Sequence, residues 1–141
     1  MVSKKSGKNT NGKWVFLSYA DKDKEFAHKL GESLEGAGVK VWLAHKELSE
    51  ADKGSRKMEE GINKCQYFCL AASNESFQSP RLKQELSVAL IEYMSPGVSL
   101  NILPLRIEEC ELPHPLSDFE PVDFFKGFDE GLTALQKALE K

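Results

Sequence analysis

The run Trp14-Val-Phe-Leu-Ser-Tyr19 is short, apolar and rich in β-branched and aromatic residues, so it predicts a β-strand that is buried on both faces. Two runs of the same kind follow, Val39-Lys-Val-Trp-Leu43 and Gln66-Tyr-Phe-Cys-Leu-Ala-Ala72. Further strands are predicted at residues 99–106 and, as a short fifth strand, at residues 122–125. Strands that lack an alternating polar face are typical of parallel sheets that helices cover on both sides.

Apolar residues at helical spacing fill the intervals between these strands. The predicted helices span about 22–37, 54–64, 80–94 and 128–140. Asp21 is expected to cap the first helix with its carboxylate, and Gly38 to end it, because glycine tolerates the left-handed conformation found there. Ser79 and Pro80 are expected to be the N-cap and the first residue of the third helix. The alternation of strands and helices predicts an α/β fold with a parallel sheet and right-handed crossovers.

The composition is that of an ordinary globular domain, with 40% hydrophobic and 29% charged residues among 141. Residues 1–13 hold four lysines and no apolar stretch, which predicts a disordered basic leader ahead of one domain at residues 14–141. That domain has 15 basic and 22 acidic residues, a net charge of −7, which argues against binding to nucleic acid. No apolar run approaches the roughly 18 residues that cross a bilayer, so no membrane association is expected.

The three cysteines, Cys65, Cys69 and Cys110, do not have the spacing of metal ligands, so no metal site is expected. Cys69 lies in an apolar run, which predicts a buried free thiol and favours a cytoplasmic location. Several functions common on this architecture lack their motifs. The turn after the first strand is bulky and acidic rather than glycine-rich, and no P-loop, zinc-protease or serine-hydrolase motif is present.

Glu85 is the acidic residue that the helical pattern singles out. With 100° per residue, an apolar arc of about 60° forms from Leu82, Leu86, Ala89 and Tyr93, with Leu90 beside it, and this arc is expected to face the sheet. Glu85 falls at the edge of the arc, close to the strand ends. Partial desolvation should raise its pKa and a nearby cation should lower it. The alternative interpretation is an ordinary surface acid near a helix start.

Six short motifs in sequence order resemble a Toll/interleukin-1 receptor (TIR) domain of the bacterial kind. The first two are the opening strand with its acidic helix, and Gly38-Val-Lys-Val-Trp-Leu43. The others are Glu60-Gly-Ile62, Tyr67-Phe-Cys-Leu70 with Ser73-Asn-Glu-Ser76, Leu82-Lys-Gln-Glu-Leu86 and Ile102-Leu-Pro-Leu-Arg106. The resemblance spans residues 14–140 and implies a flavodoxin-like, parallel five-stranded sheet with helices on both faces, the TIR fold.

The resemblance also implies a reaction. In catalytic TIR domains, the glutamate that matches Glu85 is essential for splitting NAD+ into nicotinamide and ADP-ribose or a cyclic relative, which makes NAD+ the substrate and requires no cofactor. One carboxylate suffices, because nicotinamide leaves as a neutral amine and needs no general acid, unlike the alkoxide of ordinary glycosidases. Glu85 could stabilise the ribosyl cation, hold the ribose hydroxyls or bond briefly to the anomeric carbon.

Parallel sheets bind ligands beyond the carboxyl ends of their strands, so residues near those ends are candidates for substrate binding. The candidates are Phe16, Ser18, Tyr19, Ala20, Ala44, Lys46, Ser73 and Arg81. Three of them depart from the family. Arg81 stands where many catalytic relatives have tryptophan, and Ala44 and Lys46 replace an aspartate and an aromatic residue. The missing rings remove stacking surface, about 1–3 kcal/mol each by analogy with base stacking, whereas Arg81 and Lys46 can hold a pyrophosphate.

The loop at residues 44–53 has a second role in the family, where it reaches a neighbouring TIR domain and helps to complete the NAD+ pocket. Here Glu47, Glu50 and Asp52 make it acidic, which suits head-to-tail self-association, although an exposed solvated loop would look the same. Two hypotheses follow from the resemblance. One is an NAD+ nucleosidase activated by self-assembly, in anti-phage defence or cell death, with a fused or associated sensor module. The other is a non-catalytic adaptor that recruits other TIR domains.

Overall fold

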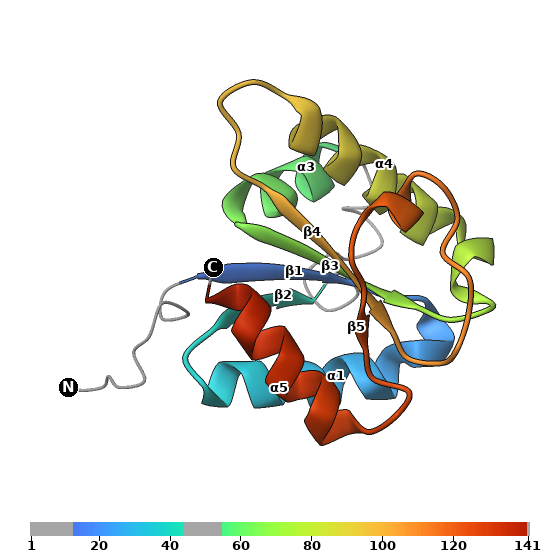
Figure 1. Cartoon of the computed structure of the whole chain (residues 1–141). Helices are drawn as coiled ribbons and strands as arrows, with labels where there is room; N and C mark the ends of the chain where they lie inside the picture. Colours follow the sequence, from blue (N-terminus) through green and yellow to red (C-terminus); the bar gives the residue numbers. More distant parts are fainter. Residues whose placement is uncertain (1–12, 44–54, 141) are drawn as a thin grey trace.

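The sheet of this domain has five parallel strands in the order β2-β1-β3-β4-β5 (Figure 1). The computed structural model describes residues 13–43 and 55–140. The strands are β1 (Trp14–Ser18), β2 (Lys40–Leu43), β3 (Tyr67–Ala72), β4 (Asn101–Arg106) and β5 (Val122–Asp123). The helices are α1 (Lys24–Gly36), α3 (Ser55–Lys64), α4 (Pro80–Met94) and α5 (Phe128–Leu139), with 3-10 turns η2 (Asp21–Asp23), η4 (Ser76–Gln78) and η5 (Leu116–Asp118). The predicted flavodoxin-like α/β fold is confirmed.

The predicted helix-end signals at Gly38, Ser79 and Pro80 are confirmed, and the one at Asp21 is wrong. The Ser79 hydroxyl accepts a hydrogen bond from the Leu82 amide at the start of α4 (3.2 Å), and Gly38 has a φ of 94° just after α1. Asp21, by contrast, begins the turn η2 and does not cap α1. The N-cap of α1 is Asp23, whose carboxylate makes no cap bond and accepts a hydrogen bond from the Ser73 hydroxyl instead (2.9 Å). The carboxylate of Asp23 therefore bonds to a residue at the end of β3 and does not cap α1.

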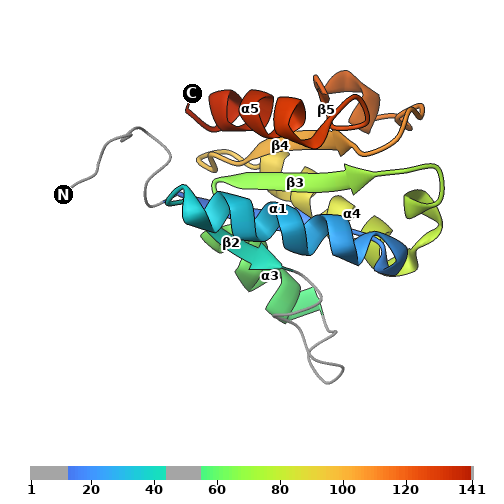
Figure 2. The ribbon, with the colours of Figure 1, turned by 90° about the horizontal axis from the view of Figure 1, so that it is seen from below.

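The helices cover the two faces of the sheet in pairs. Helices α1 and α5 lie on one face, and α3 and α4 lie on the other (Figures 1 and 2). On the second face, the ring of Phe16 stacks between those of Phe68 and Trp42, with centroid distances of 5.5 and 6.4 Å. These three rings tie β3, β1 and β2 together beneath α3. Among the described residues, no helix is long and apolar enough to cross a bilayer.

The predicted leader ends where the described chain begins. Residues 1–12 lie outside the described part, so the prediction of disorder there stays a prediction. Lys13, which that prediction included, is held in place, because its ammonium group donates to the Leu139 carbonyl (2.8 Å) and to the Tyr67 hydroxyl (3.2 Å). The start of the described chain is thereby joined to the end of α5.

Gly131 lies where α5 passes close to Phe124, the residue that follows β5. A Cβ atom at this position would lie 2.5 Å from the ring of Phe124, which is only 5% exposed. We expect Gly131→Ala to lower the free energy of unfolding by about 2 kcal/mol, because the ring or the helix must shift. Urea denaturation measures this loss. Gly36→Ala is the matched control, since a Cβ there meets nothing within 4 Å and should be neutral or mildly stabilising. Equal losses in both variants would contradict the steric explanation.

Candidate active site

Glu85 lies in the middle of the sheet-facing side of α4. It is 0% exposed, and it shares that side with Leu82 and Ala89, which are also fully buried. The predicted apolar arc was wrong at its far end, because Tyr93 is 45% exposed and its ring packs edge-on against Phe119 at 5.0 Å. The buried face of α4 is therefore centred closer to Glu85 than the predicted apolar arc was. The sequence predicted that the carboxylate would be partly desolvated, whereas the structure buries Glu85 completely.

Both carboxylate oxygens of Glu85 accept hydrogen bonds from side chains of the chain itself. The hydroxyl of Ser18 donates to Oε1, and Nη1 of Arg81 donates to Oε2, each at 2.5 Å. The second terminal nitrogen of Arg81, Nη2, donates to the Tyr19 carbonyl at 3.1 Å. Ser18 is the last residue of β1, so the carboxylate lies at the carboxyl end of the strands, where the sequence placed it. Arg81 joins this end of β1 to the first turn of α4.

The surroundings of Glu85 act on its pKa in opposite directions. Burial raises the pKa above the ordinary 4.5, and this is the largest effect. The positive charge of Arg81 and the hydrogen bonds from Ser18 and Arg81 lower the pKa, because they stabilise the ionised form. The net shift is upward. Glu85 therefore gives up its proton less readily than an exposed glutamate, and the charge of Arg81 is the largest of the effects that favour its ionised form.

Of the eight predicted substrate-binding residues, Ser18 and Arg81 donate hydrogen bonds to Glu85, and the carbonyl of Tyr19 accepts one from Arg81. The others lie elsewhere or outside the described part. Phe16 is fully buried in the ring stack, and Ala20 is 5% exposed against the same core. Ser73 is fully buried and donates its hydroxyl to Asp23. Ala44, Lys46 and the loop residues Glu47, Glu50 and Asp52 fall within residues 44–54, outside the described residues.

Asp23 is a polar residue at this end of the sheet that the sequence did not single out. It follows β1, is only 8% exposed, and accepts the Ser73 hydroxyl from the end of the neighbouring strand β3. Lys22 pairs with its other oxygen at 3.5 Å. Nothing in the local pattern distinguishes it from Asp21. Only the contact with Ser73, fifty residues away, shows that Asp23 is a buried partner rather than a surface charge.

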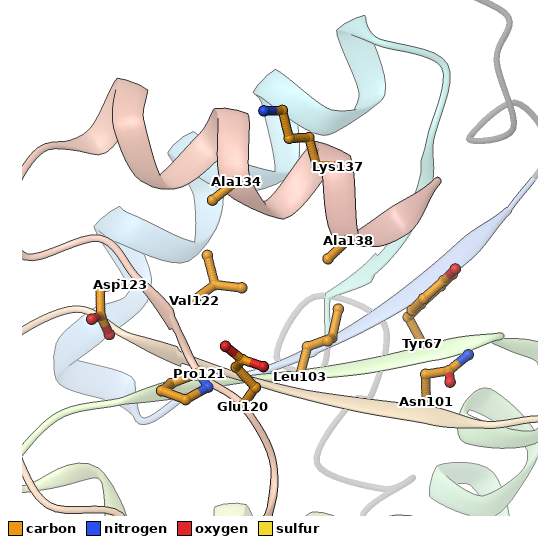
Figure 3. A pocket seen from close by; sticks show the side chains of 10 residues that line it. All are labelled: Tyr67, Asn101, Leu103, Glu120, Pro121, Val122, Asp123, Ala134, Lys137 and Ala138. Carbon is orange, nitrogen blue, oxygen red and sulfur yellow. The ribbon is translucent and has the colours of Figure 1, made fainter. Parts of the chain in front are cut away.

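A cavity of about 450 Å³ lies on the opposite face of the sheet, beside α5 (Figure 3). Strand β5 pairs with only two residues of β4, Leu105 and Arg106, so the first half of β4 is left without a neighbour on that side. Leu103 and Val122 contribute apolar surface to the cavity, and Glu120 lies at its side. The cavity shares no residue with the surroundings of Glu85, since α4 covers the other face.

Known proteins resemble this chain in sequence and in fold. The family model of the TIR domain matches residues 15–137 of this chain. Among curated proteins, the chain is 34% identical over 73 residues to the NAD(+) hydrolase TcpA of Theionarchaea archaeon (strain DG-70-1). The match covers 51% of this chain and 22% of the relative, so the chain spans under a quarter of the length of that protein.

Solved structures agree with the fold. The TIR domain of the Toll-related receptor TRR-2 from Hydra magnipapillata superposes with a TM-score of 0.74 at 19% identity, covering 90% of this chain and 98% of that one. The TIR domains of the activated Roq1 resistosome give a TM-score of 0.69 at 15% identity, covering 91% of this chain and 99% of theirs. At such identities the likeness is one of fold.

Proposed function

Because the chain belongs to the TIR domain family, we propose that it is an NAD+ nucleosidase, which breaks the bond between nicotinamide and ribose with Glu85 as its catalytic carboxylate. The observation that carries this proposal is the position of Glu85, a buried acid at the carboxyl ends of parallel strands, where such sheets bind ligands. The curated relative named as an NAD(+) hydrolase supports the choice of substrate.

The reaction needs a negative charge more than it needs a proton donor. The bond between the anomeric carbon and the pyridinium nitrogen breaks, both electrons go to the nitrogen, and nicotinamide leaves neutral. The remaining ribosyl cation is stabilised by an ionised Glu85 held by Ser18. Water then adds to the cation and releases a proton to the solvent, which gives ADP-ribose, or an adenine nitrogen of the same substrate adds and gives a cyclic product.

This role makes the reaction sensitive to pH. Only the ionised form of Glu85 stabilises a cation, and burial raises its pKa above 4.5. The rate of nicotinamide release should therefore fall as the pH is lowered through that raised pKa, and the acid limb should lie at a higher pH than an exposed glutamate would give.

Self-association completes the proposal. We propose that the acidic loop residues Glu47, Glu50 and Asp52 contact a neighbouring copy in the cytoplasm, and that assembly raises activity in defence or cell-death signalling. The Roq1 resistosome, whose TIR domains share this fold, is named as an activated assembly. A fused or associated sensor module would supply the trigger.

The test is incubation of concentrated protein with NAD+, followed by chromatography for nicotinamide. Wild type is compared with Glu85→Ala, both in solution and clustered on beads. The proposal is supported if the rate of nicotinamide release per molecule of wild type increases with protein concentration and the variant releases none. Equal release by both proteins would remove Glu85 from the mechanism.

One observation favours the second candidate, a non-catalytic adaptor. Both oxygens of Glu85 are bonded by Ser18 and Arg81, so the pair can serve to fasten α4 to β1. If clustered wild type releases no nicotinamide but captures a second TIR domain, the adaptor function replaces the enzyme.

A further inference from the structure

Glu85 is closed off in this structure, so a substrate can reach its carboxylate only after a partner moves. Ser18 is poorly suited to move, because it is 0% exposed and its backbone lies in the ladder opposite Leu70 of β3. Arg81 differs in both respects. Its long side chain is 23% exposed, and it reaches the carboxylate from the first turn of α4. Arg81 is thus the partner that can leave.

The charges of the substrate match the ion pair that covers the site. NAD+ carries a cationic nicotinamide ring on one side of its ribose and an anionic phosphate on the other. When Arg81 leaves Glu85, the cation of the substrate can take its place beside the carboxylate, while the phosphate provides a new partner for the guanidinium. One ion pair within the protein is exchanged for two with the substrate, so neither Glu85 nor Arg81 is left unpaired.

We propose that Arg81 is a specificity residue that exchanges Glu85 for a phosphate of the substrate, so that the phosphate itself uncovers the catalytic carboxylate. This inference rests on the proposed NAD+ cleavage. It assigns the substrate class as nicotinamide nucleotides that carry a phosphate on the ribose, and it excludes the corresponding nucleoside as a good substrate.

The start of α4 also suits an arriving anion. The first turn of a helix usually favours acidic residues, because its free amide groups give that end a partial positive charge. In α4 this turn holds no acidic residue, and Arg81 is the cation on the side that faces Glu85, whereas Lys83 is exposed and makes no contact with Glu85 that the structure shows. A guanidinium can bind two phosphate oxygens at once, whereas an ammonium group binds as a single point charge. Arg81 is therefore the better phosphate ligand, and Lys83 provides a matched control.

The experiment compares substrates that share the bond to be broken. Nicotinamide riboside lacks the phosphate, and nicotinamide mononucleotide has it. Wild type should cleave the mononucleotide with a kcat/KM about 10- to 100-fold above that of the riboside. Arg81→Ala should bring this ratio close to one, and Arg81→Lys should restore part of it. Lys83→Ala, which removes an exposed charge from the same turn, should leave the ratio unchanged.

A second measurement does not depend on the stability of any variant. Phosphite added to wild type should speed cleavage of nicotinamide riboside, because the free anion can take Arg81 away from Glu85. No effect of phosphite, together with a ratio that Arg81→Ala does not change, would overturn the role of Arg81 while leaving NAD+ cleavage intact. Wild type that cleaves none of the three substrates would overturn the proposed function, and this inference with it.

Discussion

Glu85→Gln is expected to lower the rate of nicotinamide release about 10³-fold, the loss seen when one well-placed electrostatic group is removed from a buried active site. Glutamine keeps the size and shape of the side chain. Its carbonyl oxygen can accept from Arg81, and its amide can donate to the Ser18 hydroxyl, which is able to accept as well as donate. The substitution therefore removes the negative charge and little else. Initial rates of nicotinamide release, measured by chromatography, provide the test.

The same variant should remain folded. Glutamine avoids the cost of burying a carboxylate, and Arg81, which is 23% exposed, can satisfy its charge with solvent. We expect the free energy of unfolding to change by no more than about 1 kcal/mol. A folded variant that keeps more than a tenth of the wild-type rate would show that the charge of Glu85 does not drive the reaction.

Arg81→Met has the largest expected effect on stability, a loss of about 3 kcal/mol at pH 8. Methionine can replace the apolar stem of the side chain, but it leaves the buried carboxylate of Glu85 without its cation. Breaking a buried pair by removing one partner costs more than the pair itself contributes, because a desolvated charge remains. Guanidinium chloride denaturation measures the loss, and Lys83→Met, on the exposed side of the same turn, should change stability by less than about 0.5 kcal/mol.

The loss should depend on pH in a defined direction. Without Arg81, the pKa of Glu85 rises further, because the main effect that lowers it is gone. Between 4.5, the ordinary value for the unfolded chain, and the raised pKa of the folded chain, the folded state binds more protons. The free energy of unfolding therefore falls as the pH rises through this window. The variant should approach wild type near pH 5, and adding Glu85→Gln should restore most of the stability at pH 8. A loss that does not vary with pH would indicate a packing defect.

The sequence predicted the architecture well because the relevant signals are local. Strands β1 and β3 consist almost entirely of apolar residues, and α4 begins at Pro80 with Ser79 as its N-cap, as those two residues predict. The order of strands in the sheet came from the TIR resemblance, and the structure agrees. The predicted cap at Asp21 failed because Asp23 is engaged by Ser73, a residue from another strand.

The site was predicted in part. The sequence placed Glu85 near the strand ends but not at full burial, because a helical projection treats an acid as polar and moves it to the edge of the apolar arc. The spacing of four residues between Arg81 and Glu85 permits a pair on one helix face, yet the bond from Arg81 to the Tyr19 carbonyl depends on the approach of β1. Contacts between elements distant in sequence decided what the local pattern could not.

The ring stack over β1, β2 and β3 also contains an intrinsic fluorophore, Trp42. The chain has only two tryptophans. The indole nitrogen of Trp42 is buried and has no hydrogen-bond partner among the described residues, and a Cβ at Gly61 would come within 2.7 Å of this ring. An indole that is shielded from water fluoresces at shorter wavelength than a hydrated one, and Trp42 is partly shielded in this way. Because Trp42 stands two residues ahead of the 44–54 segment, a shift in its emission can report engagement of that segment without any attached dye.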